Sequence, residues 1–94
     1  MIRINCFISV KSENRQKVLD AAKRLTAASL KQKGCIAYDV FESATRPEVL
    51  MICETWASKE DLDEHSASQV FHDEVSIIHN NAEMKLETFD MPGK

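Results

Sequence analysis

Residues 2–10 alternate between apolar and polar side chains, the pattern of a strand that buries one face. Apolar and β-branched residues also gather over 35–42 and 49–57, and these segments are predicted to be the second and third strands. A last strand is predicted over 83–91, and it runs into a tail of residues 91–94.

Two other segments carry apolar residues at intervals of three and four, the period of an amphipathic helix. The first helix is predicted over 13–32, with Gly34 closing it as the residue beyond its C-terminal cap. The second is interrupted, because a short helix is predicted over 59–65 and a longer one starts near Ser68. The buried stripe of the longer helix is predicted to be Phe71, Val75, Ile78 and Ala82.

The order β-α-β-β-α-β, with a broken second helix, predicts a ferredoxin-like α+β fold. In that fold an antiparallel sheet carries both helices on one face. The chain has 94 residues, so one domain over 1–94 is predicted. Its 44% hydrophobic and 29% charged residues exclude a disordered or collagen-like chain.

The third strand is apolar on both faces. One face carries Leu50, Ile52, Glu54 and Trp56, and the other carries Val49, Met51, Cys53 and Thr55. Because the helices cover only one face of the sheet, the other face needs a different cover. The sheet of a second copy is the simplest cover, and the pattern therefore predicts a homodimer through sheet faces.

Charge and cysteine content narrow the partners further. Twelve Lys and Arg residues against fifteen Asp and Glu give a net charge of −3, which argues against a nucleic-acid partner. No apolar run approaches the roughly 20 residues of a membrane span, and no signal segment opens the chain. Cys6, Cys35 and Cys53 are odd in number and form no C-x-x-C pair, which is typical of free thiols in a reducing compartment. We therefore expect a cytoplasmic protein without a membrane or nucleic-acid partner.

Three histidines, His65, His72 and His79, are spaced by seven residues. On a continuous helix that spacing separates neighbours by about 10 Å, whereas a helical metal pair needs three or four residues, so no metal site is predicted. His72 and His79 are predicted to lie on a solvated rim. His65 falls where the second helix breaks, and a break can open space between helix and sheet. His65 is therefore the candidate proton carrier, with a structural role as the alternative.

Glu54 lies within an apolar strand, and a carboxylate there needs a hydrogen bond or a cation. Arg3 and Lys85, on neighbouring strands, are the predicted candidates. Trp56 is expected to close the core and Tyr38 to lie at its edge. The sequence has no Gly-rich phosphate loop, no G-x-S-x-G and no zinc or iron–sulfur cysteine pattern, so no cofactor is predicted.

The run ETWASKEDLDEH, from Glu54 to His65, resembles the antibiotic biosynthesis monooxygenase domain family, whose members often show E-x-W, then S-x-x-x-L, then x-x-H. Upstream, the run KGCIAY over 33–38 is similar to the family segment that opens the second strand. The resemblance implies a dimeric α/β barrel with a pocket between sheet and helices in each subunit. Its monooxygenase members use molecular oxygen without metal or flavin, and the electron-rich substrate supplies the electron.

The chain departs from the residue patterns of several groups within the family. Many relatives carry a second His where this chain has Val70, and anthrone-type members have an Asn where it has Ile52. Haem-degrading members have a Trp in place of His65, so haem degradation is disfavoured. The quinol-type relatives are the nearest in sequence, although this chain lacks their second His. On the resemblance, His65 is the catalytic candidate. The substrate-binding candidates are Trp56, Tyr38, Glu54, Ile52, Val70 and Phe71.

Three functions remain open from the sequence. The first is cofactor-independent monooxygenation of a small phenolic or quinol-type substrate, with His65 as base. The second is non-oxidative isomerisation of a small carbonyl compound. The third is a non-catalytic dimer that binds a small aromatic or carbonyl ligand.

Overall fold

The structure is a computed structural model, and it describes residues 1–92. Its elements follow the predicted order. They are β1 (Ile2–Ser9), α1 (Ser12–Ser29), β2 (Cys35–Glu42), β3 (Val49–Trp56), α2 (Lys59–Ala67), α3 (Gln69–Asn81) and β4 (Glu83–Asp90). The predicted tail includes Gly93 and Lys94, which lie outside the described residues.

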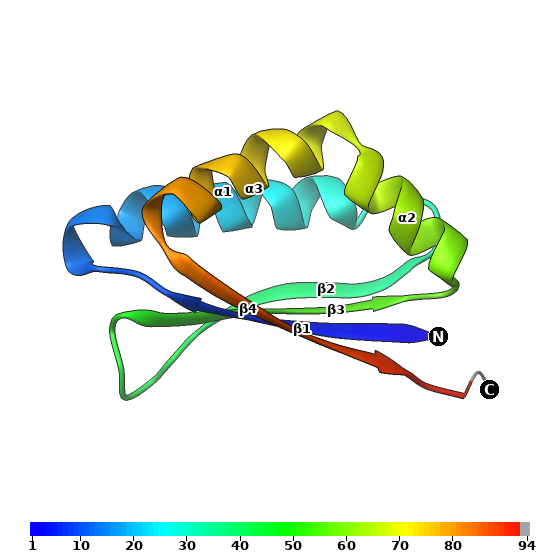
Figure 1. Ribbon diagram of the computed structural model, residues 1–94, viewed down its shortest axis with the longest axis horizontal. Coiled ribbons are helices and arrows are strands. Elements are labelled where there is room, and N and C mark those ends of the chain that lie inside the picture. The colour runs from blue at the N-terminus through cyan, green and yellow to red at the C-terminus, as the bar shows by residue number, and fades with distance from the viewer. Residues whose placement is uncertain (93–94) are drawn as a thin grey trace.

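The four strands form one antiparallel sheet in the order β2-β3-β1-β4. All three helices lie on the same face of this sheet. The helices α1 and α3 lie side by side, and α2 slopes down from the break toward the end of the sheet (Figure 1). This arrangement confirms the predicted ferredoxin-like α+β fold.

The core lies between the sheet and the helix layer. Because side chains alternate along β1, Cys6 and Ile8 point toward the helices. A stripe of buried residues on α1 packs against this face of the sheet. Two members of that stripe, Ala21 and Ala22, are fully buried and let the helix approach the sheet closely. Burying each larger aliphatic side chain stabilises the fold by about 1.5–3 kcal/mol, so this stripe fixes which face of α1 meets the sheet.

The first helix ends earlier than predicted, at Ser29 instead of residue 32. The helix is followed by tighter, 3₁₀-type turns, in which the amides of Lys31 and Gln32 donate to carbonyls three residues back, at 3.2 and 3.0 Å. Gly34 does adopt a positive φ of 78°, but in the loop beyond the helix and not directly after its cap. The prediction was wrong because the polar residues of this loop continue the helical pattern of the solvated face.

The break in the second helix lies at Ser68, close to the predicted position. The extended backbone of Ser68 ends α2 and begins α3. Its hydroxyl donates to the carbonyl of His65 at 2.6 Å and accepts from the amide of Phe71 at 3.3 Å. One serine therefore terminates the helix that carries His65 and caps the helix that carries Phe71.

The outer face of the sheet is rich in exposed apolar side chains. Phe7, Phe41 and Phe89 are 41%, 49% and 46% exposed. Met51 on β3 pairs with both Phe7 and Phe41, so three large side chains cross the sheet in one row. The second apolar face predicted for β3 is thus present, and it extends over neighbouring strands.

Within residues 1–92, every helix is too short or too polar to cross a lipid bilayer.

Candidate functional site

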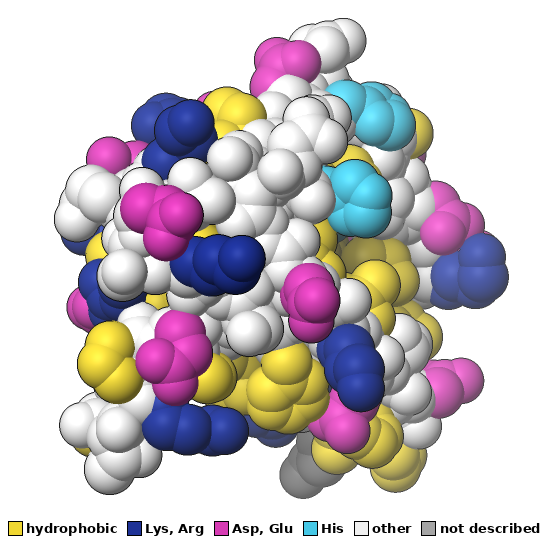
Figure 2. All heavy atoms as spheres, turned by 60° about the vertical axis from the view of Figure 1, so that its left-hand side comes forward, with side chains coloured by type: hydrophobic (Ala, Val, Ile, Leu, Met, Phe, Trp, Pro, Cys, Tyr) yellow, Lys and Arg dark blue, Asp and Glu magenta, His cyan; other side chains and the backbone are white. Residues whose placement is uncertain are grey.

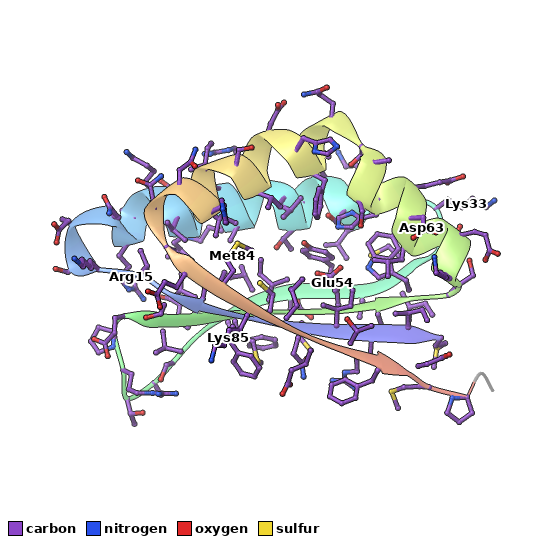
Figure 3. The ribbon with its side chains drawn as sticks, in the orientation of Figure 1. Arg15, Lys33, Glu54, Asp63, Met84 and Lys85 are labelled. Carbon is purple, nitrogen blue, oxygen red and sulfur yellow. The ribbon has the colours of Figure 1, made fainter. Side chains whose placement is uncertain are left out.

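A cavity of about 290 Å³ lies between the sheet and the helices α2 and α3. Its walls are mostly aliphatic and aromatic, with a few polar groups, as is usual for small-molecule sites. Glu54 on β3 and Met84 farther along the sheet on β4 both point toward the helix layer (Figure 3). The lining residues are Ile4, Cys6, Leu25, Tyr38, Ile52, Glu54, Leu62, His65, Ser66, Phe71, Val75, Ile78, His79, Met84 and Leu86.

The cavity opens at the side of the molecule near β4. Leu86 faces the helix side of the sheet by its register with Cys6, yet it is 66% exposed. Figure 2 shows a recess with hydrophobic side chains below histidine side chains, and His79 is among the residues that line the cavity. A small ligand has an entrance here without any movement of the helix layer.

A wider depression of about 700 Å³ lies at the opposite end of the molecule, among the loops that precede α1, β3 and β4. It is open and lined by charged and amide side chains. Its Arg15 already donates to the carbonyl of Pro47 and pairs with Glu42. This depression therefore lacks the enclosed apolar wall that a small aromatic ligand requires.

His65 lies inside an aromatic cluster and is only 2% exposed. Its ring stacks on Trp56, with centroids 4.5 Å apart and planes inclined by 33°. Tyr38 and Phe71 meet the ring edge-on at 5.6 and 5.1 Å. These contacts fix the plane of the imidazole, so each of its nitrogens has a defined direction.

The two nitrogens of His65 have different surroundings. Nδ1 lies 2.7 Å from Oε1 of Gln32. Because an amide oxygen only accepts, this contact is a hydrogen bond in the tautomer that carries its proton on Nδ1. Nε2 is buried without a hydrogen-bond partner among the described residues, and its nearest acidic oxygen is Oε1 of Glu54 at 3.8 Å. Burial lowers the pKa of His65 to about 4, so the ring is neutral at pH 7. In the tautomer with the proton on Nδ1, Nε2 is a free proton acceptor.

Glu54 is buried beneath His65. Its Oε1 accepts a hydrogen bond of 2.8 Å from the indole nitrogen of Trp56. Burial raises the pKa of Glu54, and the Trp56 indole and the Tyr38 hydroxyl oppose that rise. The carboxylate is therefore held by aromatic donors in place of a basic side chain.

The predicted partners of Glu54, Arg3 and Lys85, are wrong. Register places Arg3 opposite Thr55, so its side chain lies on the outer face, where it contacts the sulfur of Cys53 at 3.5 Å. Lys85 also points away from the helix layer (Figure 3). Both side chains therefore lie on the face of the sheet opposite to Glu54.

Of the candidate site residues, His65, Tyr38, Glu54, Ile52 and Phe71 line the cavity. Trp56 is fully buried and does not line the cavity. It contacts the site through its hydrogen bond to Glu54 and its stacking on His65. Val70 is not part of the cavity wall as residues 1–92 define it. His79, predicted to lie on a solvated rim, is exposed and also lines the cavity, whereas His72 is exposed outside it.

Gln32 was missed because the predicted helix ran through it. Once the helix ends at Ser29, Gln32 falls in the following loop and its side chain reaches His65. The only signal in the sequence was the polar run KQK before Gly34, which does not distinguish a helix end from a loop.

Cys6 lines the cavity, but burial raises the pKa of its thiol to about 11, so the thiol stays protonated. Cys6, Cys35 and Cys53 are free thiols. No group of three or more His, Cys, Asp and Glu side chains within residues 1–92 is placed to hold a metal ion.

We expect the free energy of unfolding to fall as pH is lowered from about 7 to 4. A histidine in the unfolded chain takes up its proton near pH 6.5, whereas the pKa of His65 in the folded protein is about 4. The unfolded state binds more protons in this window, and acid therefore favours it, by up to about 3 kcal/mol. Glu54 acts in the opposite sense, since its raised pKa favours the folded state as pH falls toward 4.5.

Chemical denaturation at several pH values measures this dependence. His65→Leu removes the titrating group, and its unfolding free energy should vary less with pH than that of the wild type. His72→Leu, at an exposed position of α3, is the matched control and should keep the wild-type slope. Equal slopes for the wild type and His65→Leu would show that His65 is not held neutral by burial.

Similar proteins were found by family and by structure. The family model for antibiotic biosynthesis monooxygenase matches residues 1–75. A structure from Bacteroides thetaiotaomicron, a conserved protein of unknown function described as a possible oxidoreductase, is 54% identical with a TM-score of 0.94, and 96% of each chain is covered. A conserved protein from Methanosarcina mazei is 29% identical with a TM-score of 0.88, covering 94% of this chain and 89% of that one.

A third structure shares the fold alone. SnoaB, a cofactor-independent oxygenase from Streptomyces nogalater, is 10% identical with a TM-score of 0.86, and the match covers 99% of this chain and 94% of that one. No curated protein matches this sequence.

Proposed function

The chain belongs to the antibiotic biosynthesis monooxygenase family, and from that membership we propose that it is a cofactor-independent monooxygenase of a small phenolic or quinol-type substrate. The observation that carries the proposal is the buried, unpartnered Nε2 of a neutral His65, a residue that lines a mostly apolar cavity. A buried acceptor without a partner costs about 1–3 kcal/mol, and a ligand hydroxyl would recover that cost.

The polar groups of the cavity also favour a hydroxyl donor. Nε2 of His65 and the carboxylate of Glu54 both accept, and the surrounding walls are apolar. A ligand that presents a hydroxyl group would satisfy them, whereas a carboxylate or a quinone oxygen has no proton to offer to either acceptor. A cavity of about 290 Å³ suits one or two aromatic rings.

In the proposed reaction, His65 takes the phenolic proton at Nε2. The phenolate gives one electron to molecular oxygen, the two radicals combine at a ring carbon that bears hydrogen, and the hydroperoxide loses water. A phenol and one O₂ then yield a quinone and one H₂O, so no external reductant is consumed. The imidazolium lies 3.8 Å from Oε1 of Glu54, which would stabilise it in this low-dielectric site.

Oxygen uptake with a panel of hydroquinones, naphthols and anthrones tests the proposal. We expect enzyme-dependent uptake of one O₂ per substrate, and with ¹⁸O₂ one labelled atom in the product. The carboxylate and quinone analogues of the same compounds should bind more weakly. Tight binding of the phenols with no oxygen uptake would favour a binding module over an enzyme.

Isomerisation of a small carbonyl compound is a second candidate. The observation in its favour is that two groups able to carry a proton, His65 and Glu54, line one cavity with Nε2 and Oε1 3.8 Å apart. Moving a proton between neighbouring carbons of a substrate requires such a pair. An isomerase would exchange substrate hydrogen with D₂O and consume no oxygen. The same substrate panel, extended with hydroxyketones, therefore separates the two reactions.

We also propose that two copies associate through the outer faces of their sheets. The row of Phe7, Met51 and Phe41 supports this, because an exposed apolar face of this kind favours a two-fold contact.

Met51→Lys is expected to weaken that association at least tenfold. It places two like charges and two long polar side chains at the centre of the proposed contact. Sedimentation of the wild type should give about 21 kDa, twice the 10.7 kDa chain, and the variant should shift toward one chain. Leu30→Lys, at an exposed apolar residue after α1, is the matched control. A wild type that stays monomeric at micromolar concentration would contradict the proposed association.

A further inference from the structure

We propose that Gln32 is a positioning residue that selects the tautomer of His65. Its amide oxygen holds the imidazole proton on Nδ1, 2.7 Å away, and thereby leaves Nε2 as the proton acceptor in the cavity. Only the catalytic consequence rests on the proposed function, because the tautomer itself is a property of the unliganded protein.

The tautomer with the proton on Nδ1 needs a stabilising interaction, because two effects favour the proton on Nε2 instead. The neutral histidine side chain in water prefers its proton on Nε2, and Oε1 of Glu54, 3.8 Å from Nε2, also attracts a proton to that side. With the proton on Nε2 the ring could not accept a proton from a ligand in the cavity. One short hydrogen bond in a buried site contributes enough free energy to reverse the preference.

The loop that carries Gln32 is fixed at both ends. The amide of Gln32 donates to Ser29 at 3.0 Å, and its carbonyl accepts from Cys35 at 3.3 Å. Two residues on, the carbonyl of Gly34 accepts from the amide of Ala57 at 2.8 Å and ties the loop to the end of β3. These backbone hydrogen bonds fix the turn that carries Gln32, and so fix the position from which its side-chain amide reaches His65.

The other titratable groups around His65 do not take this role. Glu54 faces Nε2, and Tyr38 meets the ring edge-on from β2. Cys6 from β1 and His79 from α3 line the same cavity. Among the described residues, the oxygen of Gln32 is the hydrogen-bond partner of Nδ1.

The first test measures the tautomer by ¹⁵N NMR of the histidine ring in the unliganded protein. We expect the wild type to show Nδ1–H with an unprotonated Nε2. Gln32→Leu should move the proton to Nε2, and Gln32→Glu should keep it on Nδ1 and raise the pKa of His65 by about one unit or more. Lys31→Ala, an exposed change in the same loop, is the control and should show the wild-type pattern.

Gln32→Asn covers the case in which the leucine variant does not fold, since it keeps the amide but shortens its reach. It should lose Nδ1–H as the leucine variant does. An Nε2–H tautomer in the wild type, or Nδ1–H retained in both the leucine and asparagine variants, would overturn the proposal.

The second test is the pH profile of turnover with a substrate from the oxygen-uptake panel. Gln32→Leu should lower kcat about tenfold or more with little change in KM, and Gln32→Glu should shift the acid limb of the profile upward. An unchanged kcat in a variant whose tautomer has moved would also overturn the positioning role. If no compound is turned over by the wild type, the proposed function fails while the NMR result still decides the role of Gln32.

Discussion

His65→Ala is expected to lower kcat/KM by about a hundredfold or more while the fold and the oligomeric state stay intact. The variant removes the only buried nitrogen of the cavity that is free to accept a proton in residues 1–92. A phenol has a pKa near 10 and gives up its proton with difficulty at pH 7, so loss of the base removes most of the reactive phenolate. Steady-state oxygen uptake over a range of substrate concentrations measures kcat/KM, and circular dichroism checks the fold.

The control is His72→Ala, because His72 is exposed and lies outside the cavity. His79→Ala is not a control, since His79 lines the cavity and its loss can raise KM. Added imidazole should restore part of the turnover of His65→Ala by occupying the space left in the aromatic cluster. Equal, modest losses for His65→Ala and His72→Ala would demote His65 to a structural residue.

Three features of the site account for how a histidine of depressed pKa can still act as a base. A neutral ring is always available at pH 7, because burial lowers the pKa of His65 to about 4. Proton transfer from a ligand replaces a phenol and a neutral ring by a phenolate and an imidazolium in contact, so no isolated charge is created. The Glu54 carboxylate, held by Trp56, lies 3.8 Å from the new cation and further stabilises it.

Much of this fold was predictable because it is encoded by local periodicity. Alternation in β1 and the apolar stripe of α1 indicate which side chains meet in the core, and the antiparallel register follows once β3 is aligned. The family motif likewise places Glu54, Trp56 and His65 in one site, and the structure brings their side chains into contact.

The features that the sequence did not predict depend on which face of a strand a residue occupies and on the residue at which a helix ends. Arg3 was proposed as a partner of Glu54 because it is close along the sheet, but a shift of one residue in a strand reverses the face. Gln32 acts only because α1 stops at Ser29, and the termination of a helix by three-residue turns leaves little trace in residue type. Val70 lies one residue before Phe71, so on the helix it points away from the wall that Phe71 forms.

Gly34→Ala is expected to reduce the free energy of unfolding by about 3 kcal/mol, the largest loss of stability from any single methyl group that we predict. At a φ of 78° an alanine costs about 1–2 kcal/mol more than glycine. The new Cβ would also overlap the side chain of Asp61, which packs directly over the glycine. Asp61 cannot easily yield, because it is buried and its carboxylate and amide both bond to the hydroxyl of Ser58 at the start of α2.

Thermal and chemical denaturation at fixed protein concentration measure this loss, since dimerisation would otherwise change the apparent stability. Lys33→Ala, at the exposed neighbouring position, is the matched control and should change the stability by less than about 0.5 kcal/mol. A Gly34→Ala variant as stable as the wild type would mean that the loop relaxes without strain. The strain would also affect the site. If the loop or α2 moves to relieve the overlap, Gln32 is displaced from His65. Gly34→Ala should therefore lose the Nδ1–H signal of His65 even at temperatures where the variant remains folded.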